Sequence, residues 1–225
     1  MMSSPSIEPT SSLADLAVRF AGASRVFHRY GLDYCCHGRI ALQEACSRRG
    51  VDPEAVLAEV RAAAATASAG PGPVDAPLPD LIQHILGHYH EPHRAEVPRL
   101  LEMATRVETV HGDKPECPRG LAAHLARMGE ELEMHMQKEE QMLFPMILAG
   151  RGAKAGMPIS VMEEEHQDHG KNLERLRQLA HDFVPPECAC NTWRALYLGL
   201  DELEQDLMDH IHLENNVLFP RALKG

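Results

Sequence analysis

Two segments of the chain carry the same motif, and this repetition is the strongest constraint on the fold. In each segment a histidine is followed four residues later by a glutamate, and Leu-Phe-Pro comes after three further residues. The motif H-x3-E-x3-L-F-P occupies His135–Pro145 and recurs 75 residues later at His210–Pro220. A weaker H-x2-H motif recurs 76 residues apart, at His90–His93 and His166–His169. Two halves with matched offsets predict a duplicated helical hairpin with pseudo-twofold symmetry.

Helical periodicity continues through most of the chain, and no segment alternates apolar and polar residues as a strand would. Four long helical stretches with short connections predict an all-α protein built around an antiparallel four-helix bundle. A capping box at Ser160–Glu163 is expected to begin the third stretch. The expected helical stretches are 78–112, 118–149, 158–183 and 190–222.

A smaller helical domain is expected before the bundle. Apolar spacing predicts one helix over 13–30 and a second over 40–48, and Asp52-Pro53-Glu54 has the residue types of a third helix start. A segment rich in proline and glycine follows these helices and is typical of a linker. The predicted organisation is a small helical domain over 1–65, a linker over 66–79 and the bundle over 80–225.

The repeated motifs are suited to binding metal ions inside the bundle. Residues four positions apart on a helix are neighbours on one face, so a histidine and a glutamate can bind one metal pair together. A rise of about 1.5 Å per residue puts one histidine of each helix at a similar height in the bundle. Four imidazoles and two carboxylates suit two first-row metal ions, and we expect two iron ions. The expected ligands are His90, His135, Glu139, His166, His210 and Glu214.

The two glutamates are expected to bridge the irons together with an oxo or hydroxo group. Each iron then has two histidines and one open position for a small molecule. His93 and His169 could each add a ligand, but a position behind the ligands or on the surface is favoured. If its helix is continuous, His111 lies about 31 Å from His90, which argues against a ligand role. Pro92 is expected to disturb the first helix beside His90. The run Glu163–Glu165 is interpreted as a solvated acidic turn, of which one residue could line an access path.

Charge and cysteine content limit the other function classes. Acidic residues outnumber basic ones by 33 to 22, and the formal net charge of −11 argues against general nucleic-acid binding. No apolar segment is long enough to span a membrane, and the polar residues 1–12 lack the features of a signal peptide. We therefore expect a cytoplasmic protein whose 6 cysteines are reduced and whose cysteine spacings fit no zinc motif.

Several longer motifs resemble those of the iron–sulfur cluster repair di-iron proteins, which join a hemerythrin-like bundle to a short N-terminal domain. That domain is marked by adjacent cysteines after Asp-Tyr or Asp-Phe, as in Asp33-Tyr34-Cys35-Cys36. The resemblance covers nearly the whole chain and implies the same six iron ligands. It also implies repair of clusters damaged by nitric oxide or oxidative stress, with donation of iron as the means. The other matching motifs are Val107–Pro115, Pro158–His166 and Asp209–Pro220.

Three functions are compatible with these features. The first is repair of damaged iron–sulfur proteins, the second is reduction of nitric oxide at the di-iron site, and the third is binding or sensing of O2 as in a hemerythrin. Cys35 and Cys36 are assigned a thiol role, in thiol exchange, iron transfer or nitrosation, and their presence favours the first function over the third. The expected partners are damaged iron–sulfur proteins and small molecules such as NO or O2. A homodimer is compatible with the sequence, whereas nucleic acid and membrane are not expected as partners.

Overall fold

The computed structural model describes residues 7–66 and 73–225, and these residues form helices and connecting turns without a strand. Residues 1–6 of the segment compared with a signal peptide, and 67–72 of the predicted linker, lie outside the described residues. The chain divides into two compact units. Unit 1 comprises the chain up to Leu81 together with Met208–Arg221, and unit 2 comprises Ile82–Leu207 together with Ala222–Gly225.

Within residues 7–66, the described N-terminal part of unit 1, the helices are α1 (Leu13–Arg19), α2 (Ala23–Arg29), α3 (Leu42–Arg49) and α4 (Pro53–Thr66). Their shared core is apolar and fully buried, and Met208 from the C-terminal part of the chain packs against it. The expected single helix over 13–30 is wrong, because the chain leaves helical geometry at Phe20 and Gly22 adopts a left-handed φ of 84°. Glycine tolerates that conformation, which lets α2 start in a new direction.

Gly38 makes the closest backbone approach in unit 1, in the turn that follows the adjacent cysteines. A Cβ atom there would lie 2.2 Å from the carbonyl oxygen of Tyr34 and 3.1 Å from the Cβ of Ala14. We therefore expect Gly38→Ala to lower the free energy of unfolding of unit 1 by about 3 kcal/mol, since overpacked backbone has to shift. Urea unfolding followed by circular dichroism would measure this. Gly156→Ala is the control, because a Cβ at Gly156 meets nothing within 4 Å; equal losses in both variants would contradict the steric explanation.

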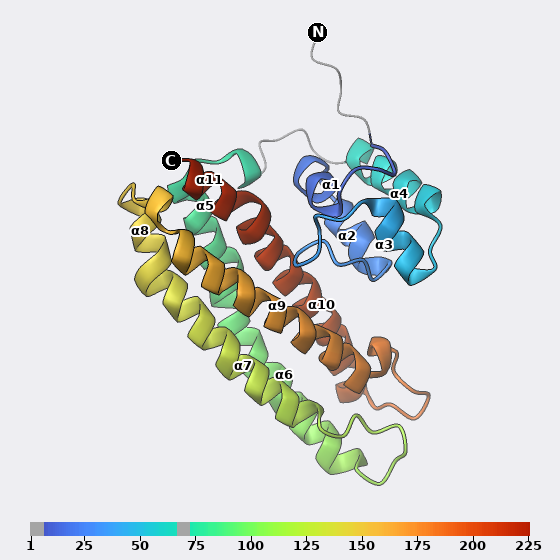
Figure 1. Ribbon diagram of the computed structural model, residues 1–225. Coiled ribbons are helices and arrows are strands. Elements are labelled where there is room, and N and C mark those ends of the chain that lie inside the picture. Colours follow the sequence, from blue (N-terminus) through green and yellow to red (C-terminus); the bar gives the residue numbers. More distant parts are fainter. Residues whose placement is uncertain (1–6, 67–72) are drawn as a thin grey trace. The chain divides into compact units, whose positions relative to one another are not determined.

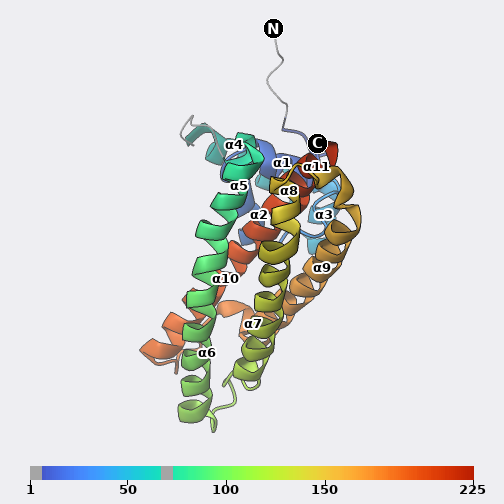
Figure 2. The same cartoon turned by 90° about the vertical axis from the view of Figure 1, so that its left-hand side faces the viewer.

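Unit 2 is built from long helices, which Figures 1 and 2 show from two sides. The first begins as α5 (Leu78–Ile85), which belongs to unit 2 from Ile82 onward, and continues as α6 (Glu91–His111). It is followed by α7 (Leu121–Lys138) with its extension α8 (Phe144–Leu148), and by α9 (Gly156–Leu179). The last is α10 (Asn191–Leu213), which belongs to unit 2 up to Leu207 and is extended by α11 (Phe219–Lys224).

These helices pack around one core as an antiparallel four-helix bundle, which confirms the predicted fold class. α6 packs on α7 and α7 packs on α9, as the two views show. Arg177 of α9 bonds Glu204 of α10, with its Nε 3.0 Å from Oε1. Gly199 of α10 approaches Leu100 of α6 so closely that a Cβ would lie 2.7 Å from the leucine side chain. No described helix is long and apolar enough to cross a membrane.

Three π-helical turns interrupt the long helices, each ending two residues before a proline. The turns are Leu86–His90, Glu139–Leu143 and Glu214–Leu218, and the prolines are Pro92, Pro145 and Pro220. Proline has no N–H to donate to the carbonyl four residues earlier, and its ring crowds that carbonyl. In each helix the N–H just before the proline bonds the carbonyl five residues back, as Glu91 does to Leu86. Pro92 therefore widens its helix without breaking it.

The third long helix begins earlier than expected. α9 starts at Gly156 after an Ala155 cap that makes no side-chain hydrogen bond. The capping box expected at Ser160–Glu163 is wrong, because Pro158 is accommodated in the first turn of the helix, where its missing N–H costs nothing. The run Glu163–Glu165 therefore lies within the helix, and its interpretation as a turn is also wrong.

Candidate metal centre

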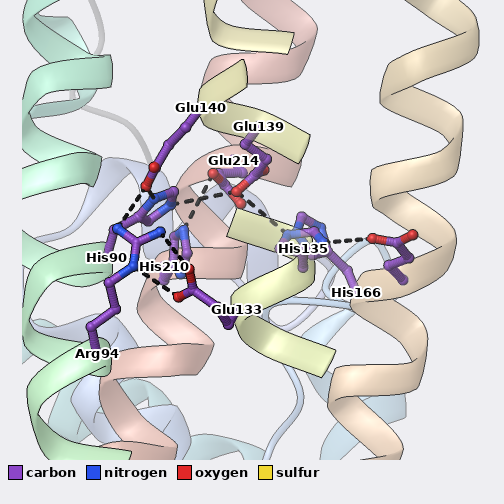
Figure 3. A network of polar contacts seen from close by, with 10 residues as sticks. His90, Arg94, Glu133, His135, Glu139, Glu140, His166, His210 and Glu214 are labelled. Carbon is purple, nitrogen blue, oxygen red and sulfur yellow. Dashed lines mark hydrogen bonds and ion pairs between the residues drawn. The ribbon is translucent and has the colours of Figure 1, made fainter. Parts of the chain in front are cut away.

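Four of the expected ligands lie together inside unit 2, within the long helices. His90 ends the first π turn, Glu139 begins the second, His135 lies one helical turn before Glu139, and His166 lies on α9. One oxygen of Glu139, Oε2, lies 3.4 Å from His90 Nε2 and 3.5 Å from His135 Nε2. The Nε2 atoms of His135 and His166 are 3.0 Å apart. Figure 3 shows the four side chains converging, and none of them is more than 2 % exposed.

The remaining two expected ligands lie on the Met208–Arg221 segment. His210 and Glu214 are one helical turn apart, and His210 Nε2 lies 3.3 Å from Glu214 Oε1. Both side chains are buried, at 1 % and 0 % exposure. The second copy of the repeated motif thus forms the same histidine–glutamate pair as the first copy, in which His135 faces Glu139.

The six side chains form two overlapping groups of possible metal ligands. In each group the donor atoms all lie within 4.8 Å of one another. Glu139 and Glu214 belong to both groups; His90 and His210 complete one, and His135 and His166 complete the other. A buried carboxylate is costly unless a positive charge compensates it. Two buried carboxylates with imidazole nitrogens around them are the donor set that a borderline transition-metal ion requires, so these residues fit a pair of such ions.

Carboxylates outside these groups hold two of the histidines in orientation. His90 Nδ1 lies 2.7 Å from Glu140 Oε1, and His135 Nδ1 lies 2.9 Å from Glu165 Oε2. A hydrogen bond at Nδ1 leaves the lone pair of Nε2 pointing inward, where a metal ion can accept it. Arg94 donates to Glu140 over 2.9 Å, and Lys138 pairs with Glu165. Sequence reasoning missed both carboxylates, since only their contacts across helices reveal the role.

The charges of these two carboxylates are stabilised by their partners. The hydrogen bond with His135, followed by that with Lys138, lowers the pKa of Glu165 to about 2 despite partial burial. Burial alone would raise the pKa of Glu140, but the hydrogen bonds from Arg94 and His90 lower it overall. Both groups are therefore anionic at neutral pH and can polarise the imidazoles that they contact.

Two comparisons with known proteins bear on this site. The domain family described as Hemerythrin HHE cation binding domain matches residues 81–222, and one described as a domain of unknown function (DUF542) matches residues 9–64. The chain is 48 % identical to the iron-sulfur cluster repair protein YtfE of Pectobacterium carotovorum and 49 % identical to that of Yersinia pseudotuberculosis. Each match covers 95 % of this chain and 97 % of the relative. The chain belongs to the iron–sulfur cluster repair family.

The hemerythrin match spans all six candidate ligands, and the N-terminal match spans Cys35 and Cys36. The cation-binding description of the matched domain agrees with the two buried histidine–glutamate groups. This places the metal-binding part of the repair family protein in the bundle and leaves the adjacent cysteines in a separate element.

Other histidines of this repair family protein lie near the centre or far from it. His93 and His169 are buried at 2 % and 3 % exposure, so a surface position is wrong for both. The ring of His169 lies 4.9 Å from that of His135, yet His169 is in neither ligand group. His111 ends α6 and places its Nε2 3.2 Å from the Sγ of Cys190.

Two surface pockets of unit 2 reach the carboxylates behind the histidines. One of about 370 Å³ is lined by Glu165 and His169 together with Glu131, Asp168 and Lys138. The other, of about 330 Å³, includes Glu140 and Arg94 in its lining. A small molecule or ion in the first pocket is therefore separated from His135 by the side chain of Glu165. One in the second pocket is separated from His90 by the side chain of Glu140.

Glu165 should behave as a positioning residue for His135. We expect Glu165→Ala to weaken iron binding by about 10–100-fold, because the imidazole loses the bond that orients it. Glu165→Gln should restore part of the affinity, since its amide oxygen can still accept from Nδ1. Competition with a ferrous chelator would measure both affinities. Glu131→Ala is the matched control, because Glu131 lines the same pocket and bonds Asn172 instead; an equal loss in that variant would contradict the positioning role.

Proposed function

We propose that this protein repairs damaged iron–sulfur clusters by supplying iron from a di-iron centre. The observation that carries the proposal is the pair of overlapping buried ligand groups that share two glutamates, in a chain whose relatives are named iron-sulfur cluster repair proteins. The ligands are His90, His135, Glu139, His166, His210 and Glu214. When bound, the iron pair supplies ferrous ions and redox equivalents to the damaged cluster.

The residues of the chain suit iron that is held and then released. Two carboxylates serve two divalent ions, and the other donors are neutral imidazoles, so the ligands offset only part of the metal charge. Ligand sets with more carboxylates would hold hard ions more firmly. The pocket at Glu165 lies one side chain away from His135, and its lining combines Glu131, Glu165 and Asp168 with Lys138 and Lys171.

The proposal extends to partners and compartment. Damaged iron–sulfur proteins are the proposed macromolecular partners, and NO and O2 are the proposed small-molecule partners. The proposed compartment is the cytoplasm, whose reducing conditions suit a labile ferrous centre and keep thiols such as those of Cys35 and Cys36 reduced. A homodimer remains a prediction that analytical ultracentrifugation of the iron-loaded protein would test.

Reactivation of a damaged enzyme tests the proposal directly. A [4Fe–4S] dehydratase inactivated by nitric oxide is incubated anaerobically with the iron-loaded protein, a reductant and a ferrous chelator that suppresses free iron. We expect activity to return, and no more than background recovery with Glu139→Ala or with the same amount of ferrous salt. No reactivation by the iron-loaded protein would contradict iron donation. Formation of nitrous oxide without reactivation would instead favour nitric oxide reduction at the same centre.

A further inference from the structure

We propose that Asp33, Cys35 and Cys36 form a second metal site, which takes a borderline-soft divalent transition-metal ion such as Zn²⁺ or Co²⁺. The site lies in the turn between α2 and α3 and uses residues of unit 1 only. It gives the assigned thiol role of the cysteine pair a specific chemistry. The proposal rests on local geometry and does not depend on iron in the bundle.

The three donor groups already converge. The Sγ atoms of Cys35 and Cys36 are 3.4 Å apart, and the Cys35 thiol donates to Asp33 Oδ1 over 3.3 Å. One donor atom from each of the three residues lies within 4.8 Å of the others. Two sulfurs and one carboxylate oxygen at this spacing can bind one ion together, with a fourth position left for water in a tetrahedral arrangement.

Hydrogen bonds fix this turn before any ion binds. Asp33 Oδ1 accepts from the backbone N–H groups of Cys35 and Cys36 at 3.1 and 2.9 Å, and His37 Nδ1 lies 2.6 Å from the other oxygen, Oδ2. The contact with His37 fixes the orientation of the Asp33 carboxylate, in the way that hydrogen-bond partners orient the ligands of known metal sites.

The backbone of the same turn is tied to the Met208–Arg221 segment. His212 Nδ1 lies 3.3 Å from the carbonyl oxygen of Tyr34, and Asn215 donates to the carbonyl oxygen of Cys35 over 3.2 Å. The Tyr34 hydroxyl donates to Asp209 over 2.7 Å. A turn held from both sides loses little conformational freedom when an ion binds, so more of the binding free energy appears as affinity.

Metal binding at this turn exchanges protons for the ion. Both S–H bonds break, two protons leave to solvent and two metal–sulfur bonds form, with no change of oxidation state. The two sulfurs are non-bonded at their observed separation, and adjacent cysteines form a disulfide only with strain.

Cobalt binding to the iron-loaded, full-length protein tests the site. Co²⁺ is titrated anaerobically, and cysteine ligation appears as a thiolate-to-cobalt charge-transfer absorption in the near ultraviolet. We expect one cobalt per chain with this band and two protons released per cobalt, followed with a pH indicator. Cys36→Ser and Cys35→Ser should each abolish the band, and Asp33→Asn should weaken cobalt binding. Circular dichroism confirms that the variants are folded; Cys36 is half-buried, so its substitution is the milder one.

The double variant Cys188→Ser/Cys190→Ser is the matched control, because these two thiols are exposed and lie in unit 2. The band should persist in it unchanged. A band that persists in folded Cys36→Ser, or that vanishes in the double variant, would overturn the assignment, as would the absence of any band in the parent protein. Failure of the bundle to bind iron would not mimic these results, since cobalt held by histidine and glutamate gives no thiolate band.

Discussion

Glu139→Ala is expected to lose both iron ions, whereas His90→Ala or His166→Ala should lose about one. The reason is the membership of the two ligand groups, because Glu139 belongs to both and each histidine to one. Removing a shared carboxylate leaves both ions with too few anionic ligands, while removing one imidazole leaves the other group intact. Iron per chain, measured by chemical analysis after anaerobic loading and desalting, separates the outcomes.

Glu131→Ala serves as the control for this series. Its carboxylate is exposed on α7 and bonds Asn172, so the variant should keep the iron content of the parent protein. Retention of one ion in Glu139→Ala would mean that the glutamate serves a single ion. Loss of both ions in His90→Ala and in His166→Ala would mean that the two groups fill only together. Either result would replace the present assignment of shared and separate ligands.

Four of the six candidate ligands form two pairs whose geometry is local. A histidine and a glutamate four residues apart share a helix face in any α-helix, and the repetition of that pair in two helices pointed to one site. Glu140 and Glu165 could not be predicted in the same way. Each acts on a histidine of another helix, His90 and His135, and nothing in the sequence around a glutamate indicates which helix will pack beside it.

Backbone detail was harder to predict than the number of helices. The break after α1 depends on Gly22, whose left-handed conformation is one of several that glycine adopts. Pro92 indicated a disturbed helix, but a kink and a π turn can both accommodate its missing N–H, and the packing of the bundle decides between them. The grouping of Met208–Arg221 with unit 1 follows from contacts such as that of Asn215 with Cys35, which link residues 180 positions apart in the chain.

Removal of iron should destabilise the bundle more than any single substitution in its surface. An ion that binds only the folded state at a thousand times its dissociation constant adds about 4 kcal/mol to the free energy of unfolding, and two such ions add about 8 kcal/mol. In the iron-free protein the buried carboxylates of Glu139 and Glu214 lose their compensating charge and repel each other. Anaerobic urea unfolding at pH 7, with iron and after chelation, measures the difference.

We expect the effect of Glu139→Gln on the free energy of unfolding, relative to the parent protein, to change sign when iron is removed. With iron present the variant should be the less stable protein, because it cannot hold the metal pair. Without iron it should be more stable than the parent by about 1–3 kcal/mol, because a neutral amide of the same shape replaces a buried carboxylate. A parent protein whose unfolding is unaffected by chelation would contradict a metal centre in the bundle. An iron-free variant less stable than the iron-free parent would show instead that the carboxylate contributes to folding through its own protein contacts.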